Sequence, residues 1–277
     1  MGIMSNDDPR LDRMCVHTMT TRPMPLELAV REYADAGVAA ITVWREHLEP
    51  SGAKQAANVI NDSGLAVASL CRGGFFTSSS EAERIKSIDE NRRAIDEAQV
   101  IGAPLVVLVC GAAADQHLDT SRGQIAEGIA AVLPHAEAAG VRLAIEPLHP
   151  MYADTRSAIN TLCQANDMVE QLSAPNVGVA VDVYHTWWDP NLQSEIARAG
   201  DSIFAFHVCD WRVPTRDLLN DRALMGDGCI PIRQIRSWVD VAGFEGFVEV
   251  ELFSDEYWDQ DQTVFLEQIV RAYSAHC

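Results

Sequence analysis

The amino-acid sequence predicts an α/β protein folded as a (β/α)8 TIM barrel. Segments of strand type and of helix type alternate along the 277 residues, eight of each, which is the pattern of this fold. The competing fold, a doubly wound open sheet, requires a glycine-rich turn after an early strand, and neither GxGxxG nor GxxxxGK occurs. With 48% hydrophobic residues, the chain can bury one large core. We therefore expect one domain over residues 1–277, with residues 1–10 as a flexible N-terminal segment.

Strands are expected where short runs of apolar and β-branched residues lie between turn signals. These runs cover residues 14–18, 39–44, 65–71, 104–110, 141–146, 177–182, 202–207 and 244–251. Helices are expected between them, at residues 26–36, 51–62, 78–101, 119–139, 158–172, 192–199 and 231–242, with a last helix through Tyr273. Their ends carry typical signals. Pro25 precedes the first helix, serines open the third, and Gly37 and Gly140 follow the first and the fourth.

The strand at residues 177–182, VGVAVD, predicts how the barrel is lined. Its apolar run indicates burial on both faces, as in a parallel sheet covered by helices. Gly178 and Ala180 share a face with Asp182, whereas the three valines share the other face. Small residues are therefore expected inside the barrel and bulky ones toward the helices. On the next strand, the inner face is expected to hold Ile203, Ala205 and His207, and the helix face Phe204 and Phe206.

Four late strands end in a residue of metal-ligand type: Glu146, Asp182, His207 and Glu251. A single strand-end acid can simply cap a helix or lie in solvent. Four in succession favour convergence on the barrel mouth, where barrel enzymes place their active sites. One histidine with three carboxylates suits Mn²⁺ best or else Mg²⁺, with Co²⁺ or Zn²⁺ as further candidates.

Glu249 does not fit this simple pattern. It shares the face of Glu251, so it should lie a layer deeper in the barrel, where an unpaired charge is costly. Arg142 shares the face of Glu146 on another strand. A deep ion pair or a water-mediated link between Arg142 and Glu249 is a hypothesis.

The charge composition indicates which kinds of ligand or partner the protein can bind. The 21 basic and 40 acidic residues give a formal net charge of −19, which disfavours nucleic acid and anionic membranes and favours a neutral substrate. There is no leader pattern and no apolar run near the roughly 20 residues of a membrane span, so we expect a cytoplasmic protein. Seven scattered cysteines without a CxxC motif indicate neither a disulfide framework nor a cysteine metal site. Neither lysine, Lys54 or Lys86, falls at a strand end, which argues against a Schiff base.

The motifs IEPLHP, VDVYH, FHVCDW with the later MGDG, and EVELF carry a family resemblance. They resemble the sugar phosphate isomerase/epimerase family of xylose isomerase-like barrels, which includes ketose 3-epimerases, hydroxypyruvate isomerases and inosose dehydratases. The resemblance implies that Glu146, Asp182, His207 and Glu251 hold one divalent metal ion. It also implies that Glu146 and Glu251 are catalytic: one removes a proton next to a metal-polarised carbonyl, giving an enediolate, and the other returns it from the opposite side.

Further residues near the strand ends are expected to contact the substrate. The resemblance assigns His185, three residues after Asp182, to substrate oxygens. It also calls for an arginine after His207, for which Arg212 is the first candidate and Arg216 and Arg222 are alternatives. The other expected contacts are His17, Trp44, His149, Asp210 and Trp211, and the rim is completed by Glu46, Arg72 and Cys110.

Three functions remain open at this point. The first is a metal-dependent isomerase or epimerase acting on a small ketose or polyol ketone, expected to be unphosphorylated because no residue cluster resembles a phosphate cradle. The second is a lyase on the same scaffold that dehydrates an inosose-like ring or eliminates from an oxidised glycoside. The third is a non-catalytic sugar-binding or partner subunit. Barrels of this kind often associate through mouth loops and outer helices, so a homo-oligomer is also an expectation.

Overall fold

The computed structural model describes residues 11–277, so the expected flexible segment at residues 1–10 lies outside the described residues. Within the described part, parallel strands close into an eight-stranded barrel in the order β1-β10-β7-β6-β5-β4-β3-β2. The strands are β1 (Met14–His17), β2 (Ala40–Trp44), β3 (Ala66–Gly74), β4 (Leu105–Val109), β5 (Arg142–Ile145), β6 (Val177–Asp182), β7 (Ile203–Val208) and β10 (Val248–Val250). The predicted (β/α)8 barrel is thus confirmed.

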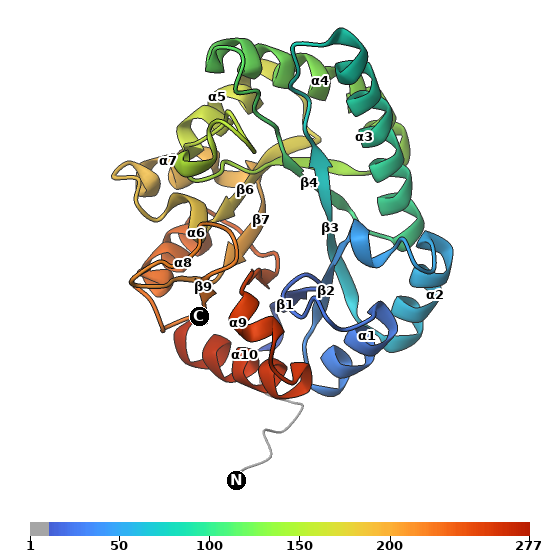
Figure 1. Cartoon of the computed structure of the whole chain (residues 1–277), viewed down its shortest axis with the longest axis vertical. Helices are drawn as coiled ribbons and strands as arrows, with labels where there is room; N and C mark the ends of the chain where they lie inside the picture. Colours follow the sequence, from blue (N-terminus) through green and yellow to red (C-terminus); the bar gives the residue numbers. More distant parts are fainter. Residues whose placement is uncertain (1–10) are drawn as a thin grey trace.

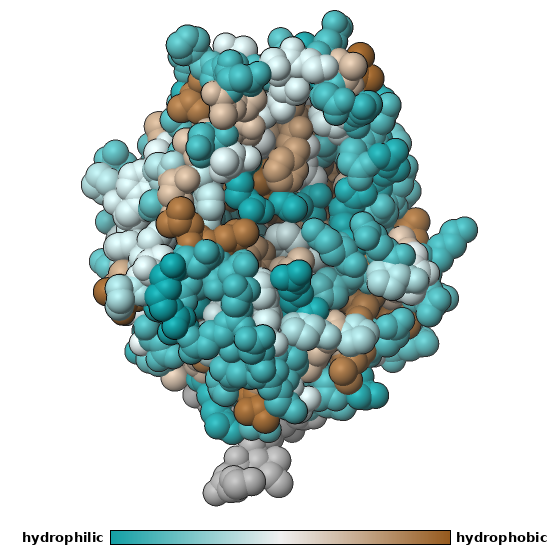
Figure 2. All heavy atoms as spheres, viewed as in Figure 1, coloured by the Kyte–Doolittle hydropathy of each residue, from teal (hydrophilic) through white to brown (hydrophobic). Residues whose placement is uncertain are grey.

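The helices form a ring around the strands (Figure 1). They are α1 (Leu26–Asp35), α2 (Ala53–Ser63), α3 (Glu81–Ile101), α4 (Leu118–Ala139), α5 (Leu162–Leu172), α7 (Leu192–Ala199), α8 (Ile232–Val241) and α10 (Gln262–His276). Between residues 11 and 277, no helix combines the length and the apolar character needed to cross a bilayer. The face of the molecule seen in Figure 2 is largely hydrophilic, with hydrophobic residues in separate patches.

Short elements that the sequence pattern does not predict lie on the mouth side of the barrel. The helices α6 (Val183–Thr186) and α9 (Asp255–Trp258) directly follow the segments that leave β6 and β10. The strands β8 (Asp210–Trp211) and β9 (Arg222–Ala223) pair antiparallel and form a separate two-stranded sheet. These elements shape the surroundings of the strand ends.

The two faces of the barrel wall are lined as the alternation predicts over most of β6. The valines of β6 belong to the large core between strands and helices, whereas Ala180 packs inside the barrel with Ala144, Ala205 and Val107. A Cβ at Gly178 would collide with the carbonyl oxygen of Ser202 and with a neighbouring phenylalanine ring. Small residues on the inner face therefore allow the strands to approach one another closely.

The start of β7 departs from the predicted alternation. Val179 pairs with Ile203 and Ala180 pairs with Ala205, so Phe204 has no partner on β6. An extra residue in one strand turns the side chains of the residues before it to the opposite face of the sheet. Ile203 consequently lies in the outer core and Phe204 packs against the inner cluster, the opposite of the prediction for these two residues.

Candidate functional site

The four strand-end residues converge at the mouth of the barrel. They leave β5, β6, β7 and β10, which are neighbours in the barrel. Glu146, Asp182, His207 and Glu251 are all buried, and one ligand atom from each lies within 4.8 Å of the others. Asp182 also ends its strand and begins α6, because its Oδ1 accepts a 2.7 Å hydrogen bond from the backbone N–H of Tyr184. This leaves Oδ2 of Asp182 for the site.

Unsatisfied donor and acceptor atoms at this point fit a metal ion. Among residues 11–277, no hydrogen-bond partner exists for the buried Oε1 of Glu146, Oδ2 of Asp182 or either ring nitrogen of His207. Nδ1 of His207 lies 2.9 Å from Oε1 of Glu146, but the two are not aligned as a hydrogen bond. Buried polar atoms are rarely left unpaired, and three carboxylates with one imidazole are a familiar divalent-metal set. The residues therefore fit the cofactor expected from the sequence.

Burial and nearby charges shift the pKa values of Asp182 and His207. Burial raises the pKa of Asp182 well above its usual value, and nearby Glu251 and Glu146 add to this, against the lowering effect of Arg222. Burial lowers the pKa of His207, but the surrounding carboxylates outweigh it and raise the pKa to about 10. A divalent ion needs a deprotonated carboxylate and a neutral imidazole. Metal binding is therefore expected to release protons here.

Arg222 from β9 is the cation that faces this group. Its Nη1 donates to Oε2 of Glu251 at 2.7 Å and lies 3.5 Å from Oδ2 of Asp182. The guanidinium lies 4.3 Å and 4.6 Å from the ring centroids of Tyr184 and Phe253, and only 2% of the residue is exposed. Burial raises the pKa of Glu251, but Arg222 and His17 hold it well below its usual value. Glu251 is thus ionised.

His185 lies beside the metal candidates as expected. Its Nδ1 accepts a 3.2 Å hydrogen bond from the backbone N–H of His149, and its Nε2 lies 3.6 Å from Oδ2 of Asp182 and 3.4 Å from Nη2 of Arg222. Burial, followed by the charge of Arg222, lowers the pKa of His185 well below its usual value. The imidazole is therefore neutral, and Nε2 faces the site.

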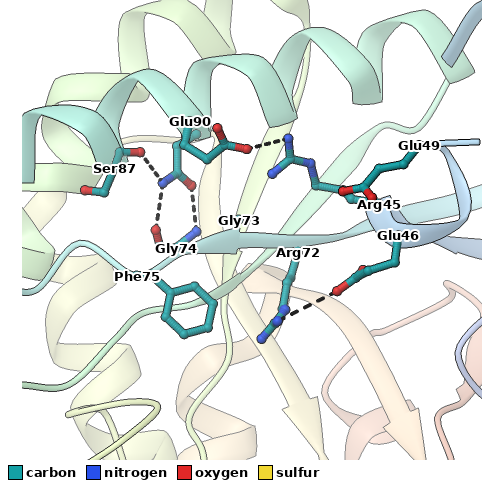
Figure 3. Close-up of a pocket in the computed structure, with 10 residues that line it drawn as sticks. Arg45, Glu46, Glu49, Arg72, Gly73, Gly74, Phe75, Ser87 and Glu90 are labelled. Atoms are coloured by element: carbon teal, nitrogen blue, oxygen red, sulfur yellow. Dashed lines mark hydrogen bonds and ion pairs between the residues drawn. The ribbon is translucent and has the colours of Figure 1, made fainter. Parts of the chain in front are cut away.

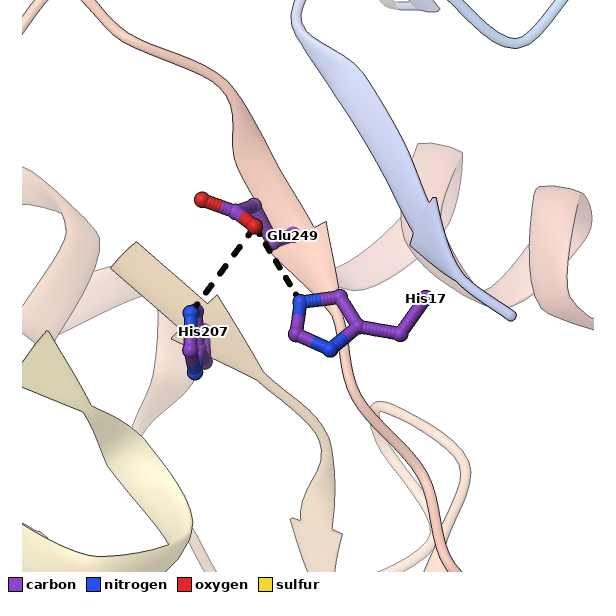
Figure 4. A group of neighbouring side chains, drawn as sticks. All are labelled: His17, His207 and Glu249. Carbon is purple, nitrogen blue, oxygen red and sulfur yellow. Dashed lines mark hydrogen bonds and ion pairs between the residues drawn. The ribbon is translucent and has the colours of Figure 1, made fainter. Parts of the chain in front are cut away.

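A second layer of polar side chains lies around Glu249, whose carboxylate faces both His17 and His207 (Figure 4). Oε2 of Glu249 accepts hydrogen bonds from Nε2 of His17 at 3.1 Å, from Thr42 at 2.5 Å and from Ser69 at 3.2 Å. The same oxygen lies 3.8 Å from Nε2 of His207. Burial raises the pKa of Glu249, but His17 and His207 outweigh it and the pKa is lowered. Glu249 is therefore a buried carboxylate below the ring of His207.

The hypothesis of an ion pair between Arg142 and Glu249 is wrong. Arg142 is the exposed first residue of β5, and its guanidinium lies 4.4 Å from the ring centroid of Phe204. The charge of Glu249 is satisfied by side chains from β1, β2 and β3 instead. His17, expected at the rim, lies in this deeper layer and accepts a 3.1 Å hydrogen bond at Nδ1 from Nε1 of Trp44.

The structure brings some of the expected substrate contacts to the site. Trp44 and His185 line a small cavity together with Glu146, Glu251 and Arg222. His149 and Trp211 lie to one side of it, with ring centroids 5.1 Å apart, and Trp211 stacks on Tyr184 at 4.8 Å.

Arg212 and Asp210 are engaged elsewhere. Nε of Arg212 lies 2.9 Å from Oδ1 of Asp221, and its guanidinium lies over the ring of Tyr257, so the structure does not place it with the four candidate ligands. Of the three arginines considered, Arg222 is the one at the site. The carboxylate of Asp210 accepts backbone N–H hydrogen bonds from Trp211, Gly226 and Ile230, which fixes the loop that contains MGDG.

The cavity lining also includes six residues that the sequence did not indicate, among them Tyr152, Arg156 and Phe253. Tyr152, Arg156 and Phe253 line the cavity above Glu146 and Glu251. Phe253 follows Glu251 by two residues, a spacing that could have indicated the same side of the chain. Tyr152 and Arg156 lie in the irregular segment after β5, where no periodic pattern indicates their direction.

Comparison with known proteins places these features in a family. Residues 30–269 match the family described as xylose isomerase-like TIM barrel. The chain is 29% identical over 189 residues to inosose isomerase of Halalkalibacterium halodurans, a match to 66% of this chain and slightly less than two thirds (65%) of that protein. It is 25% identical over 248 residues to fructoselysine 3-epimerase of Shigella flexneri, covering 83% and 86% of the two chains. It is also 27% identical over 179 residues to 3-dehydroshikimate dehydratase of Pseudomonas putida, covering 62% of this chain and 27% of that one.

Solved structures share the fold of this chain. Protein SMc04130 from Sinorhizobium meliloti 1021 is 46% identical, with a TM-score of 0.94 and coverage of 96% of this chain and 99% of that chain. The IOLI protein, solved with a bound zinc atom, is 23% identical with a TM-score of 0.81 over 96% and 99% of the two chains, and shares the fold. The chain therefore belongs to the xylose isomerase-like TIM barrel family.

Proposed function

We propose that this protein is a divalent-metal-dependent sugar isomerase or epimerase that acts on a small ketose or polyol ketone by removing a proton next to a carbonyl. The observation that carries the proposal is the convergence of Glu146, Asp182, His207 and Glu251 within 4.8 Å of one another. The names of the similar inosose isomerase and fructoselysine 3-epimerase support this class of reaction. Mn²⁺ is the preferred candidate for the metal because most donors are carboxylates.

The four residues would hold the ion, which when bound supplies Lewis-acid polarisation of the substrate carbonyl and an adjacent hydroxyl. The protein's own groups then handle the proton. Glu146 and Glu251 follow β5 and β10, the outer two of the four adjacent strands, so they approach the centre of the site from different sides. One can remove a proton from carbon and the other can return it, which inverts the centre or moves the carbonyl.

The surrounding side chains orient the substrate and limit access of water. The neutral His185 offers Nε2 to a substrate hydroxyl, and Arg222 can shift one of its N–H groups from Glu251 to a substrate oxygen. Trp44 and Phe253 provide an apolar wall for the C–H face of a sugar. The hydroxyl of Tyr152 donates to the carbonyl oxygen of Leu218, which fixes the 212–221 loop beside the cavity.

A lyase on the same scaffold is the second candidate. The similarity to 3-dehydroshikimate dehydratase favours it, because dehydration can begin with the same removal of a proton next to a carbonyl. The two reactions differ in the step after proton removal. Return of the proton gives an isomer or epimer, whereas loss of a hydroxide gives an enone.

Proton NMR in deuterium oxide tests the proposal directly. Metal-loaded protein is incubated with a panel of ketoses and inososes. Deuterium incorporation with a new stereoisomer or carbonyl isomer is expected, and vinylic signals would indicate the lyase. Glu146→Gln and Glu251→Gln should each lower the rate at least about 10²-fold if these residues carry the proton. Absence of exchange into every ketone tested, with the metal bound, would contradict both enzymatic functions and leave a sugar-binding subunit.

A further inference from the structure

A large pocket adjoins the candidate active site on the side of the early strands. Its volume is about 670 Å³, and its walls include Arg22, Trp44, Arg72, Arg156 and Phe253. Trp44, Arg156 and Phe253 also line the small cavity above Glu146 and Glu251. The pocket therefore lies directly beside the candidate active site and has the size of a small-molecule binding site.

Within residues 11–277, Arg22 and Arg156 of this pocket form no ion pair, and Arg72 forms only one long ion pair. Nη1 of Arg72 is buried without a hydrogen-bond partner, and Nη2 lies 3.8 Å from Oε1 of Glu46, beyond hydrogen-bonding distance. Within residues 11–277, no ion pair or side-chain hydrogen bond engages the guanidinium of Arg156, which lies 5.8 Å from the ring centroid of Tyr152. Arg22 lies over the ring of Trp258 at 5.0 Å.

Other arginines of the chain, in contrast, form close ion pairs with carboxylates. Arg45 pairs with Glu97 at 2.5 Å and with Glu90 at 2.7 Å, and Arg216 pairs with Glu256 at 2.6 Å and also with Asp221. Figure 3 shows Arg45 and Arg72 on opposite sides of β3, with Arg45 directed at Glu90 and Arg72 lying near Glu46 and the ring of Phe75. In a chain with 40 acidic and 21 basic residues, arginines without close acidic partners stand out.

The positive charges of these arginines also repel one another. Burial lowers the pKa of Arg156, and the positive charges of Arg72 and Arg222 lower it further. Guanidinium groups that share a half-enclosed site repel each other, and an oxyanion between them removes the repulsion and accepts paired N–H donors from each. The lining of the pocket contains three arginines and two glutamates, Glu27 and Glu46, so its formal charge is positive although the net charge of the chain is −19.

We propose that Arg72 and Arg156, with Arg22 at the outer edge, bind an oxyanion carried by the substrate, either a carboxylate or a phosphate. The anion lies at the end of the substrate remote from the carbon whose proton Glu146 and Glu251 exchange. This inference rests on the proposed function and names the substrate class of the same site. It replaces the expectation of a neutral, unphosphorylated sugar, which rested on the net charge and on the absence of a recognisable phosphate motif.

Three ketoses that differ only at one end test whether the pocket binds a carboxylate, a phosphate or neither. D-fructose, D-fructuronate and D-fructose 6-phosphate share a ketose and differ in whether the far end is a hydroxyl, a carboxylate or a phosphate. Inorganic phosphate and malonate probe anion binding without the sugar, and the Arg72→Gln and Arg156→Gln variants separate binding to the arginines from binding to the metal. Dissociation constants are measured by calorimetry with the metal-loaded full chain at constant ionic strength, so that turnover is not required.

We expect one of the two anionic ketoses to bind about tenfold or more tighter than fructose, as hydrogen bonds to a charged group suggest. Arg72→Gln and Arg156→Gln should each remove most of this preference, so that the affinity for the anionic ketose falls much more than the affinity for fructose, whereas Arg156→Lys should retain part of the preference. Arg271→Gln makes the same change of charge at an exposed position on α10 and should leave the preference intact. The identity of the preferred ketose distinguishes carboxylate from phosphate.

Equal binding of the three ketoses, a preference that survives both glutamine variants, or failure of all five probes to bind would overturn the inference. The proposed function is judged separately, by deuterium exchange. Charge-selective binding without exchange would retain the anion site and reject the isomerase. Exchange into ketoses without any preference for the anionic ones, or with a preference that survives in Arg72→Gln and Arg156→Gln, would retain the isomerase and reject the anion site.

Discussion

Nη1 of Arg222 donates to the carboxylate of Glu251 at 2.7 Å and to the backbone carbonyl oxygen of the same residue at 3.0 Å. This pair links β9, which lies in the loop between β7 and α8, to the end of β10 in the barrel wall. Both residues are buried, so the pair is shielded from solvent. Arg222 therefore balances the carboxylate that we propose as a catalytic group.

The pair should contribute strongly to stability when no metal is bound. Arg222→Gln removes one partner and leaves a buried carboxylate, which typically costs about 3–5 kcal/mol. The loss should be smaller in metal-loaded protein, because the ion also neutralises Glu251. Urea unfolding with and without metal measures both values. Arg271→Gln, which breaks an exposed pair with Glu267, should change stability by no more than about 1 kcal/mol, and equal losses in the two variants would contradict the assignment.

Divalent metal should stabilise the fold through the four strand-end residues. At a free metal concentration about 100-fold above Kd, binding adds about 2.7 kcal/mol, which corresponds to roughly 5–10 °C in Tm. Asp182→Asn should lose most of this gain. Asp119→Asn, whose side chain is 93% exposed, should retain it. Thermal scans of chelator-treated protein with added Mn²⁺ measure the effect, and a full gain in Asp182→Asn would remove Asp182 from the ligand set.

Glu249 should affect metal binding without touching the metal. Its carboxylate fixes His17 and lies 3.8 Å from Nε2 of His207, on the opposite side of that ring from Glu146. Second-layer partners of ligand histidines commonly change metal affinity by about 10–100-fold. Glu249→Gln should weaken Mn²⁺ binding by this amount in calorimetry while the far-ultraviolet circular dichroism stays unchanged. Unaltered affinity would show that Glu249 is only a packing residue.

The sequence predicts the barrel and the four donors because both depend on local patterns. Apolar runs identify the strands, and the residue that ends each run is visible directly. The extra residue Phe204 on β7 was missed because a bulge depends on pairing with a neighbouring strand. Arg222 could not be separated from Arg212 because the choice depends on how the loop folds into β8 and β9. The partners of Glu249 come from β1, β2 and β3, at least 180 residues away, beyond the reach of any local pattern.

Acid should weaken the 212–221 loop by protonating Asp221. Burial raises the pKa of Asp221, but hydrogen bonds and charges from Arg216 and Arg212 outweigh it, so the pKa is lowered. A depressed carboxyl pKa contributes stability above the unfolded value of about 3.9 and loses it as the pH falls through the lower folded value. Wild type and Asp221→Asn should therefore differ at pH 7 and converge below about pH 4. Urea unfolding of metal-free protein across this range checks the prediction, and a constant difference would contradict it.

The most direct test of the account is the position of the metal itself. Crystals of Mn²⁺-loaded protein, measured at the manganese absorption edge, should show one anomalous peak at the barrel mouth. The account predicts that Glu146, Asp182, His207 and Glu251 each place a donor atom about 2.0–2.3 Å from this peak. A peak at another group of residues, or no peak among these four in fully loaded protein, would contradict the central claim.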